Sequence, residues 1–243
     1  MALDYDGVDD VVSHGDINAI DGAANLTIGF WINWTTQETN ASWVSKVTAT
    51  TGIEGIDTEE AATNAFRWHV SNGGWNTYGT TGNIMVAGWQ HITLYYDGGG
   101  AANADRAKVY RNAAEASLTF TGTIPTTIGS STEPFRVGGG GREGVFANVD
   151  IGQVKMWTAS LTPLEIRQDM HSYRPVRRRN LILWSHYDDG IQARDYSGTG
   201  NHGTVTGALT EGGPPQIPHP ERFMAQRLRH GGLGLWGHRL LVK

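Results

Sequence analysis

Apolar and polar residues alternate along many short segments of this chain, and clusters of Gly, Asn, Asp and Ser separate these segments. The clearest is 88–98, GWQHITLYYDG, which alternates and then stops at a turn-forming Asp-Gly pair. Alternation with a period of two predicts strands with one buried face. Strands are expected at 3–5, 11–12, 26–34, 43–47, 65–70, 84–86, 90–96, 107–111, 116–121, 135–138 and 149–157. The acidic segment 54–60 is expected to be a solvated loop.

One short helix is expected near 162–171. Thr162 supplies an N-cap hydroxyl, Pro163 occupies the first helical position, and Glu165 is placed to reach back to the cap. This combination is a capping box. The next segment, 174–180, is expected to be a connector because proline disfavours a continuing helix and its arginines resist burial. Many short strands with one helix predict an all-β, two-sheet antiparallel sandwich rather than βαβ units.

The last quarter of the chain divides into a strand-like part and an arm. Residues 181–185, LILWS, predict a further strand. We expect 1–210 to form one sandwich, to which 181–210 supplies a late strand. Donation of that strand to a neighbouring copy is the second interpretation. Residues 211–243 begin EGGPPQIPHP and are expected to form an extended, Pro/Gly-rich, basic arm.

Composition narrows the possible partners. The chain has no cysteine, which excludes disulfides, thiolate metal sites and a cysteine nucleophile. Its N-terminus shows no signal-peptide pattern, and no apolar run is long enough to cross a membrane, so we expect synthesis in a host cytoplasm and no membrane partner. Residues 1–171 are acidic overall and 172–243 are basic, a distribution that suits self-assembly between copies, binding to an acidic surface or a solvated tail. No nucleic-acid partner is expected, because no aromatic residues interleave the arginine run.

Five segments together resemble one family. They are 3–10 (LDYDGVDD), 26–32 (LTIGFWI), 88–98, 151–157 (IGQVKMW) and 161–166 (LTPLEI). In this order they resemble the laminin-G-like, concanavalin-A-like lectin/glucanase jelly rolls, including those found in phage structural proteins. The resemblance covers 1–171 and implies a jelly-roll sandwich. Residues 195–204, DYSGTGNHGT, resemble an element near the start of many such domains, although here they follow the main body.

The resemblance also implies calcium, bound by oxygen ligands from loops. Asp6, Asp9 and Asp10 match the family's N-terminal acidic motif and are the candidate ligands. The family's later acidic pair is replaced here by Gly152 and Gln153. In the alternative interpretation, the aspartates cap backbone amides of a tight turn. No cofactor is expected to be required, and calcium is the candidate ion.

Catalytic patterns are incomplete. A retaining glycosidase needs two carboxyl groups about 5 to 5.5 Å apart. Asp57 and Glu59 alternate as such a motif requires, but Gly55 stands at the nucleophile position. The histidines show no metal-ligand spacing, and His91 is expected to be a packed structural residue. The glycine run 138–141 is expected to be a turn. No catalytic residue is predicted.

Because this fold supports many functions, several remain open. The leading hypothesis is a non-enzymatic virion protein, either a phage capsid decoration or a tail-associated protein, with copies of itself or a shell or tail protein as partners. The alternative is a carbohydrate-binding lectin-like module, and a glycoside hydrolase is third. Trp75 and Tyr78 are candidate contacts to a glycan or partner. Candidate assembly residues in the arm are Arg222, Arg227, Arg229, Leu233, Leu235, Trp236 and Arg239.

Three tryptophans, Trp31, Trp89 and Trp157, lie within alternating segments and are expected to be largely buried.

Overall fold

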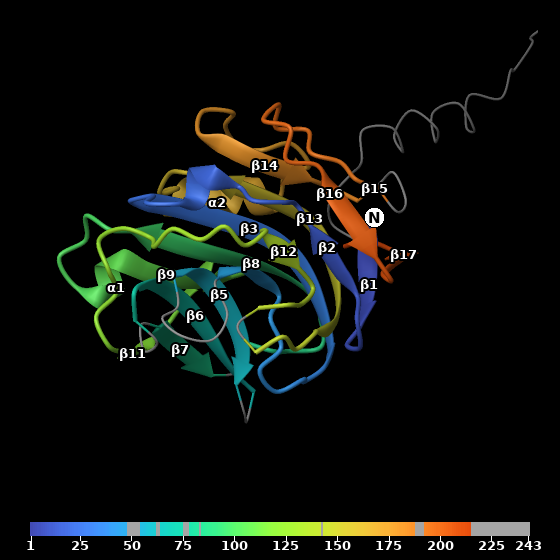
Figure 1. Ribbon diagram of the computed structural model, residues 1–243, viewed down its shortest axis with the longest axis horizontal. Helices are drawn as coiled ribbons and strands as arrows, with labels where there is room; N and C mark the ends of the chain where they lie inside the picture. Colours follow the sequence, from blue (N-terminus) through green and yellow to red (C-terminus); the bar gives the residue numbers. More distant parts are fainter. Residues whose placement is uncertain are drawn as a thin grey trace, which may run out of the picture.

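A computed structural model describes residues 1–47, 54–61, 64–74, 78–82, 84–141, 143–187 and 192–214. Two antiparallel sheets pack face to face (Figure 1). The eight-stranded sheet has the order β10-β9-β8-β3-β13-β1-β17, with β14 also paired to β13. The nine-stranded sheet has the order β11-β7-β6-β5-β4-β12-β2-β16-β15. The expected all-β jelly-roll sandwich is confirmed.

The element bounds are as follows. The eight-stranded sheet contains β1 (Ala2–Asp6), β3 (Asn25–Thr36), β8 (Gly88–Asp97), β9 (Ala107–Arg111), β10 (Ala114–Ala116), β13 (Asn148–Trp157), β14 (Leu181–Ser185) and β17 (Leu209–Glu211). The nine-stranded sheet contains β2 (Val11–Ser13), β4 (Val44–Val47), β5 (Glu54–Ala61), β6 (Ala65–Asn72), β7 (Tyr78–Gly82), β11 (Thr119–Thr121), β12 (Arg136–Val137), β15 (Gln192–Ala193) and β16 (Gly203–Thr206). The helices are η1 (Asn18–Ile20), α1 (Asn103–Arg106) and α2 (Pro163–Met170).

The interpretation of 54–60 as a solvated loop is wrong. This segment lies in β5, which pairs with β4 on one side and β6 on the other. All residues of β5 except Glu54 are buried. Ile56 belongs to the core between the sheets, while other segments cover the outer face, where Gly141 lies against Asp57. A strand covered on both faces can hold acidic side chains only when they find partners, a condition that alternation does not reveal.

Two further strand predictions differ from the structure. Residues 84–86 were expected to form a strand, yet Ile84 and Met85 are buried in irregular backbone. Burial without strand pairing explains their apolar character. The expected strand at 116–121 is divided between β10 and β11, which belong to different sheets.

Apolar side chains between the sheets form the main core. Trp43 stacks on Phe66 with ring centroids 4.4 Å apart and meets Phe30 edge-on at 6.3 Å. A second cluster lies on the outer face of the eight-stranded sheet, where Trp157 packs with Leu161 and Ile166 under α2. The fold therefore has two apolar layers, which share the eight-stranded sheet.

The helix α2 has the expected capping box. Thr162 Oγ1 accepts the Glu165 N–H at 3.2 Å, and the Glu165 carboxylate accepts the Thr162 N–H at 2.8 Å. An ion pair of 3.1 Å joins Lys155 Nζ of β13 to Asp169 Oδ1 of α2, and both side chains are buried. The helix is thus capped by its own sequence and held to the sheet by a buried charge pair. Within the described residues, no helix has both the length and the apolar character needed to cross a membrane.

The late strands join the same two sheets within one chain. Strand β13 pairs with β1 over 148–151 and with β14 over 154–157, and Gln153, at φ 49°, lies between the two pairings. Strand β16 pairs with β2, and β17 pairs with β1. Strands β16 and β17 therefore lie beside the N-terminal strands β2 and β1 (Figure 1).

We expect acid to weaken the junction between β2 and the late segment. Buried His14 hydrogen-bonds through Nδ1 to Asn201 O at 2.8 Å, and burial lowers the pKa of His14 from 6.5 to about 4. Between these pH values, the unfolded chain binds a proton that the folded chain does not. The free energy of unfolding should therefore fall as the pH is lowered through this window.

Urea unfolding at several pH values between 7 and 4 would measure this effect. His14→Gln keeps a side-chain donor but cannot titrate, so the pH dependence of its stability should be smaller by about one proton. Identical pH dependence in the two proteins would contradict the assignment. Buried His91, whose pKa burial and Lys155 lower to about 3, contributes equally to both proteins.

Candidate functional site

The loop that joins β1 to β2 is held by its own aspartates. Asp6 ends β1, and Gly7 turns the chain at φ 81°. Asp6 Oδ1 accepts the Val8 N–H at 2.8 Å, and Asp10 Oδ2 accepts the Asp6 N–H at 2.9 Å. Asp6 and Asp10 therefore cap backbone amides, as the alternative interpretation of this motif expects.

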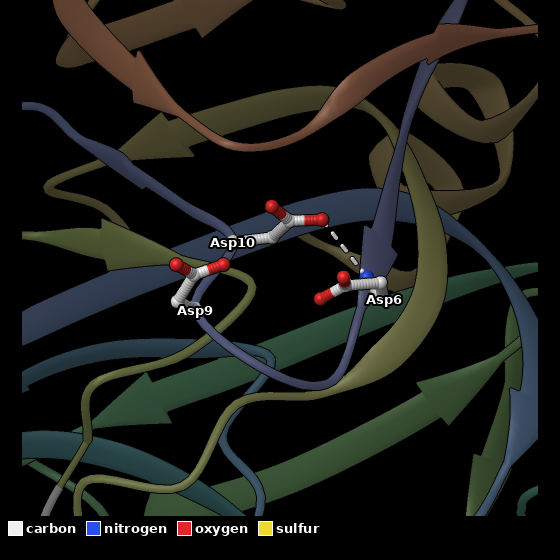
Figure 2. A group of neighbouring side chains, drawn as sticks. All are labelled: Asp6, Asp9 and Asp10. Atoms are coloured by element: carbon white, nitrogen blue, oxygen red, sulfur yellow. Dashed lines mark hydrogen bonds between the residues drawn. The ribbon is translucent and has the colours of Figure 1, made fainter.

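The same loop brings three carboxylates together, and we call Asp6, Asp9 and Asp10 the aspartate trio. One oxygen from each lies within 4.8 Å of the others. Figure 2 shows the three side chains converging, with the Asp10 carboxylate accepting a hydrogen bond from the backbone N–H of Asp6. Asp6 and Asp9 are exposed, whereas Asp10 is buried. Since calcium takes oxygen ligands at about 2.3–2.6 Å, oxygens this close can share one ion. The residues fit the ion.

Electrostatics in the trio also favour a cation. Burial raises the pKa of Asp10, the Asp6 N–H lowers it, and the charges of Asp6 and Asp9 raise it again. Gly207, at φ 74°, brings the chain so close that a Cβ there would lie 1.8 Å from Asp10 Oδ1. A divalent cation would offset the repulsion among three carboxylates in this restricted space.

The region corresponding to the family's later acidic pair adds no ligand to the aspartate trio. Gly152 lies opposite Trp31 of β3. Asp150 accepts a hydrogen bond of 2.8 Å from Asn33 Nδ2, and burial raises its pKa. No metal-sized group of ligands among the described residues includes Asp150.

The carboxylates of β5 are engaged in an ion network. Glu59 pairs with Arg67 and with His69 Nε2, the latter at 3.0 Å. Asp57 Oδ1 accepts a hydrogen bond from Ser42 Oγ at 2.6 Å. Both carboxylates are at most 3% exposed. Their side chains therefore act within the sheet rather than at an open cleft.

Tyr78 lies beside this network. Its ring centroid is 4.7 Å from that of His69, and the Arg67 guanidinium lies 5.0 Å above its ring. Trp75, its proposed companion, lies outside the described residues. The same is true of the arm residues Arg222, Arg227, Arg229, Leu233, Leu235, Trp236 and Arg239.

The sequence interpretation missed a hollow of about 520 Å³. Its walls include Val11, which directly follows Asp10, together with Arg136, Phe146, Gly140 and Gly141. The run of four glycines at 138–141 was a signal for a close backbone approach, but it predicts only a turn when taken alone.

Comparisons with known structures identify the same fold elsewhere. A Bacteroides ovatus protein provisionally assigned to carbohydrate binding has a TM-score of 0.58 and 16% identity, over 89% of this chain and 61% of that one. The heptameric SAP-like pentraxin from Limulus polyphemus has a TM-score of 0.50 and 14% identity, over 73% of this chain and 84% of that one. At these identities the likeness establishes the fold alone.

A search of curated proteins finds no match. Residues 6–167 match a family model described as the concanavalin A-like lectin/glucanases superfamily. The matched region contains the trio, the hollow and most strands of both sheets, so the chain belongs to the concanavalin A-like lectin/glucanase superfamily.

Proposed function

We propose that this protein is a non-catalytic carbohydrate-binding module whose ligand contact uses calcium at the aspartate trio. The supporting observation is the convergence of three carboxylates on an exposed loop. Calcium takes six to eight oxygen ligands, so three aspartates leave positions for water or ligand hydroxyl groups. The exposure of Asp6 and Asp9 gives solvent access to that side of the site. The assignment of the B. ovatus protein agrees with this proposal.

The ion network of β5 supports the non-catalytic part of the proposal. Retaining hydrolysis needs one carboxylate free to attack and another to donate a proton. Glu59 is instead paired with two basic side chains, Arg67 and His69. Gly55 contributes no side chain at the third position of the motif.

A role in a phage particle remains a prediction. The hypothesis depends on the arm, whose candidate assembly residues lie outside the described part of the chain. The two similar structures reported above are a protein assigned to carbohydrate binding and a pentraxin.

Calcium is expected to raise the melting temperature of the wild-type protein by several degrees, because binding to the folded state alone stabilises it. Asp9→Asn removes an exposed ligand charge and should abolish this increase. Glu115→Gln, at an exposed position of β10, is the matched control and should keep it. Differential scanning calorimetry with millimolar calcium or with EDTA would measure the effect. Equal melting temperatures in both solutions would leave the trio as a capped turn only.

A glycan microarray probed in calcium and in EDTA tests the function itself. We expect binding to particular glycans in calcium, weaker binding in EDTA, and weaker binding by Asp9→Asn in calcium. The absence of carbohydrate binding in both solutions would overturn the proposed function.

A further inference from the structure

We infer that the C-terminal segment 215–243 docks, within its own chain, on an acidic row of side chains across the eight-stranded sheet. This inference does not depend on the proposed carbohydrate binding. The row consists of residues that lie directly opposite one another on five neighbouring strands, and we call it the outer row. Its members are Leu209 of β17, Asp4 of β1, Asp150 of β13, Asn33 of β3 and Trp89 of β8.

The outer row faces away from the main core. The residues on either side of Asp4 in β1, and on either side of Asp150 in β13, all belong to that core. Because successive side chains of a strand point to opposite faces, Asp4 and Asp150 point outward. Leu209 is 68% exposed, and the other four members are half-buried. The row is therefore an open strip of surface with an acidic centre and an apolar residue at each end.

The centre of the row lacks a cation. Asp4 and Asp150 carry like charges at directly opposite positions, an arrangement that destabilises a sheet. Burial raises the pKa of Asp150, the hydrogen bond from Asn33 lowers it, and the charges of Asp4 and Glu211 raise it again. The ion pairs formed among the described residues include none of these three acidic side chains. A basic segment would supply the missing charge.

The described chain ends beside this row. A Cβ at Gly213 would lie 2.9 Å from Met1 Cα, and a Cβ at Gly152 would lie 3.4 Å from Pro214 Cδ. Gly152 is two residues beyond Asp150 on β13, a separation of about 7 Å along the strand. Arg222 follows Pro214 by eight residues, which span at most about 26–29 Å when extended. The first arginine of the segment can therefore reach the row.

The composition of the segment complements the row. Residues 215–243, which lie outside the described part of the chain, contain five basic residues and one acidic residue. Leucines and a tryptophan accompany the arginines, and they match the apolar ends of the row. A short flexible connection gives an effective concentration of about 1 mM, so a contact with a Kd of about 0.1 mM would be about 90% occupied. A second copy in dilute solution lacks this advantage, which favours docking within one chain.

The test is limited trypsin digestion of the full chain, followed over time by mass spectrometry. Trypsin cleaves after arginine, and the segment offers Arg222, Arg227 and Arg229. Exposed Arg178 and Arg179 in the connector after α2 provide an internal reference for trypsin activity. At the occupancy above, docking should slow cleavage within the segment about tenfold, because trypsin acts on the undocked fraction. Sodium chloride at about 0.5 M should remove most of this protection, while the reference sites correct for its effect on trypsin.

The variants separate docking on the outer row from a general effect of charge. The double variant Asp4→Asn, Asp150→Asn keeps the shapes of both side chains and should speed cleavage within the segment about tenfold. Glu115→Gln, on β10 near the opposite edge of the same sheet, is the matched control and should leave cleavage unchanged. Arg227→Ser combined with Arg229→Ser leaves the sandwich intact and should speed cleavage at Arg222.

Each outcome has a defined meaning once melting curves show that the variants are folded. Equal cleavage of the segment in the wild-type protein and in both double variants would overturn the inference. Protection that rises with protein concentration, together with a larger mass in light scattering, would place the segment on a second copy and overturn docking within one chain. The glycan microarray measures a different property, so failure of either proposal leaves the other standing.

Discussion

Replacing Lys46 by Met should lower the free energy of unfolding by about 3–5 kcal/mol, because it would leave acidic groups without their cation. Lys46 Nζ lies 2.9 Å from Asp16 Oδ1 and 2.9 Å from Asp21 Oδ1. It also donates to the carbonyl of Ser131. The Lys46 side chain has no solvent exposure, whereas the Asp16 and Asp21 side chains are 34% and 18% exposed, so water can reach the carboxylates but not the ammonium group.

The matched control is Lys108→Met. Lys108 pairs with Glu115 at 3.4 Å, but these two side chains are 27% and 49% exposed. An exposed pair contributes about 0–1 kcal/mol. Chemical denaturation of both variants would measure the difference. Equal losses of stability in the two variants would contradict the prediction that the ion pairs of Lys46 stabilise the fold more because Lys46 is buried.

Trp157→Ala should destabilise the protein by about 3–5 kcal/mol, the range for removing a large buried aromatic side chain. Trp157 is fully buried in the cluster between the eight-stranded sheet and α2. Its Nε1 donates to Arg177 O at 2.9 Å, which ties the sheet to the connector after the helix. The substitution would leave both a cavity and an unpaired carbonyl.

Trp89→Ala is the comparison, and it corrects a sequence expectation. Trp31 and Trp157 are buried as predicted, but Trp89 is only half-buried. Trp89 is the second residue of β8 and therefore lies near one end of that strand. We therefore expect a smaller loss from Trp89→Ala than from Trp157→Ala in thermal and urea unfolding. A larger loss of stability in Trp89→Ala than in Trp157→Ala would contradict the packing of Trp157 in the second apolar layer.

Local sequence patterns determined much of this fold. Alternation placed the central strands β3, β8 and β13, because one face of each must be apolar to meet the core. Thr162, Pro163 and Glu165 predicted the start of α2, because capping involves only neighbouring residues. The acidic motif at 6–10 identified residues that do converge, because a short loop keeps them within a few ångströms.

Tertiary structure decided the features that depend on residues far apart in sequence. Asp57 and Glu59 belong to a buried strand because Ser42, Arg67 and His69 supply their partners. The hollow forms where β2, β4, β12 and the glycines Gly140 and Gly141 meet, so no single segment indicates it. Lys46 is buried beside two carboxylates although its sequence neighbours predict only an ordinary strand. Alternation and capping act over a few residues, whereas burial of charge and the shape of a pocket depend on what folding brings from elsewhere in the chain.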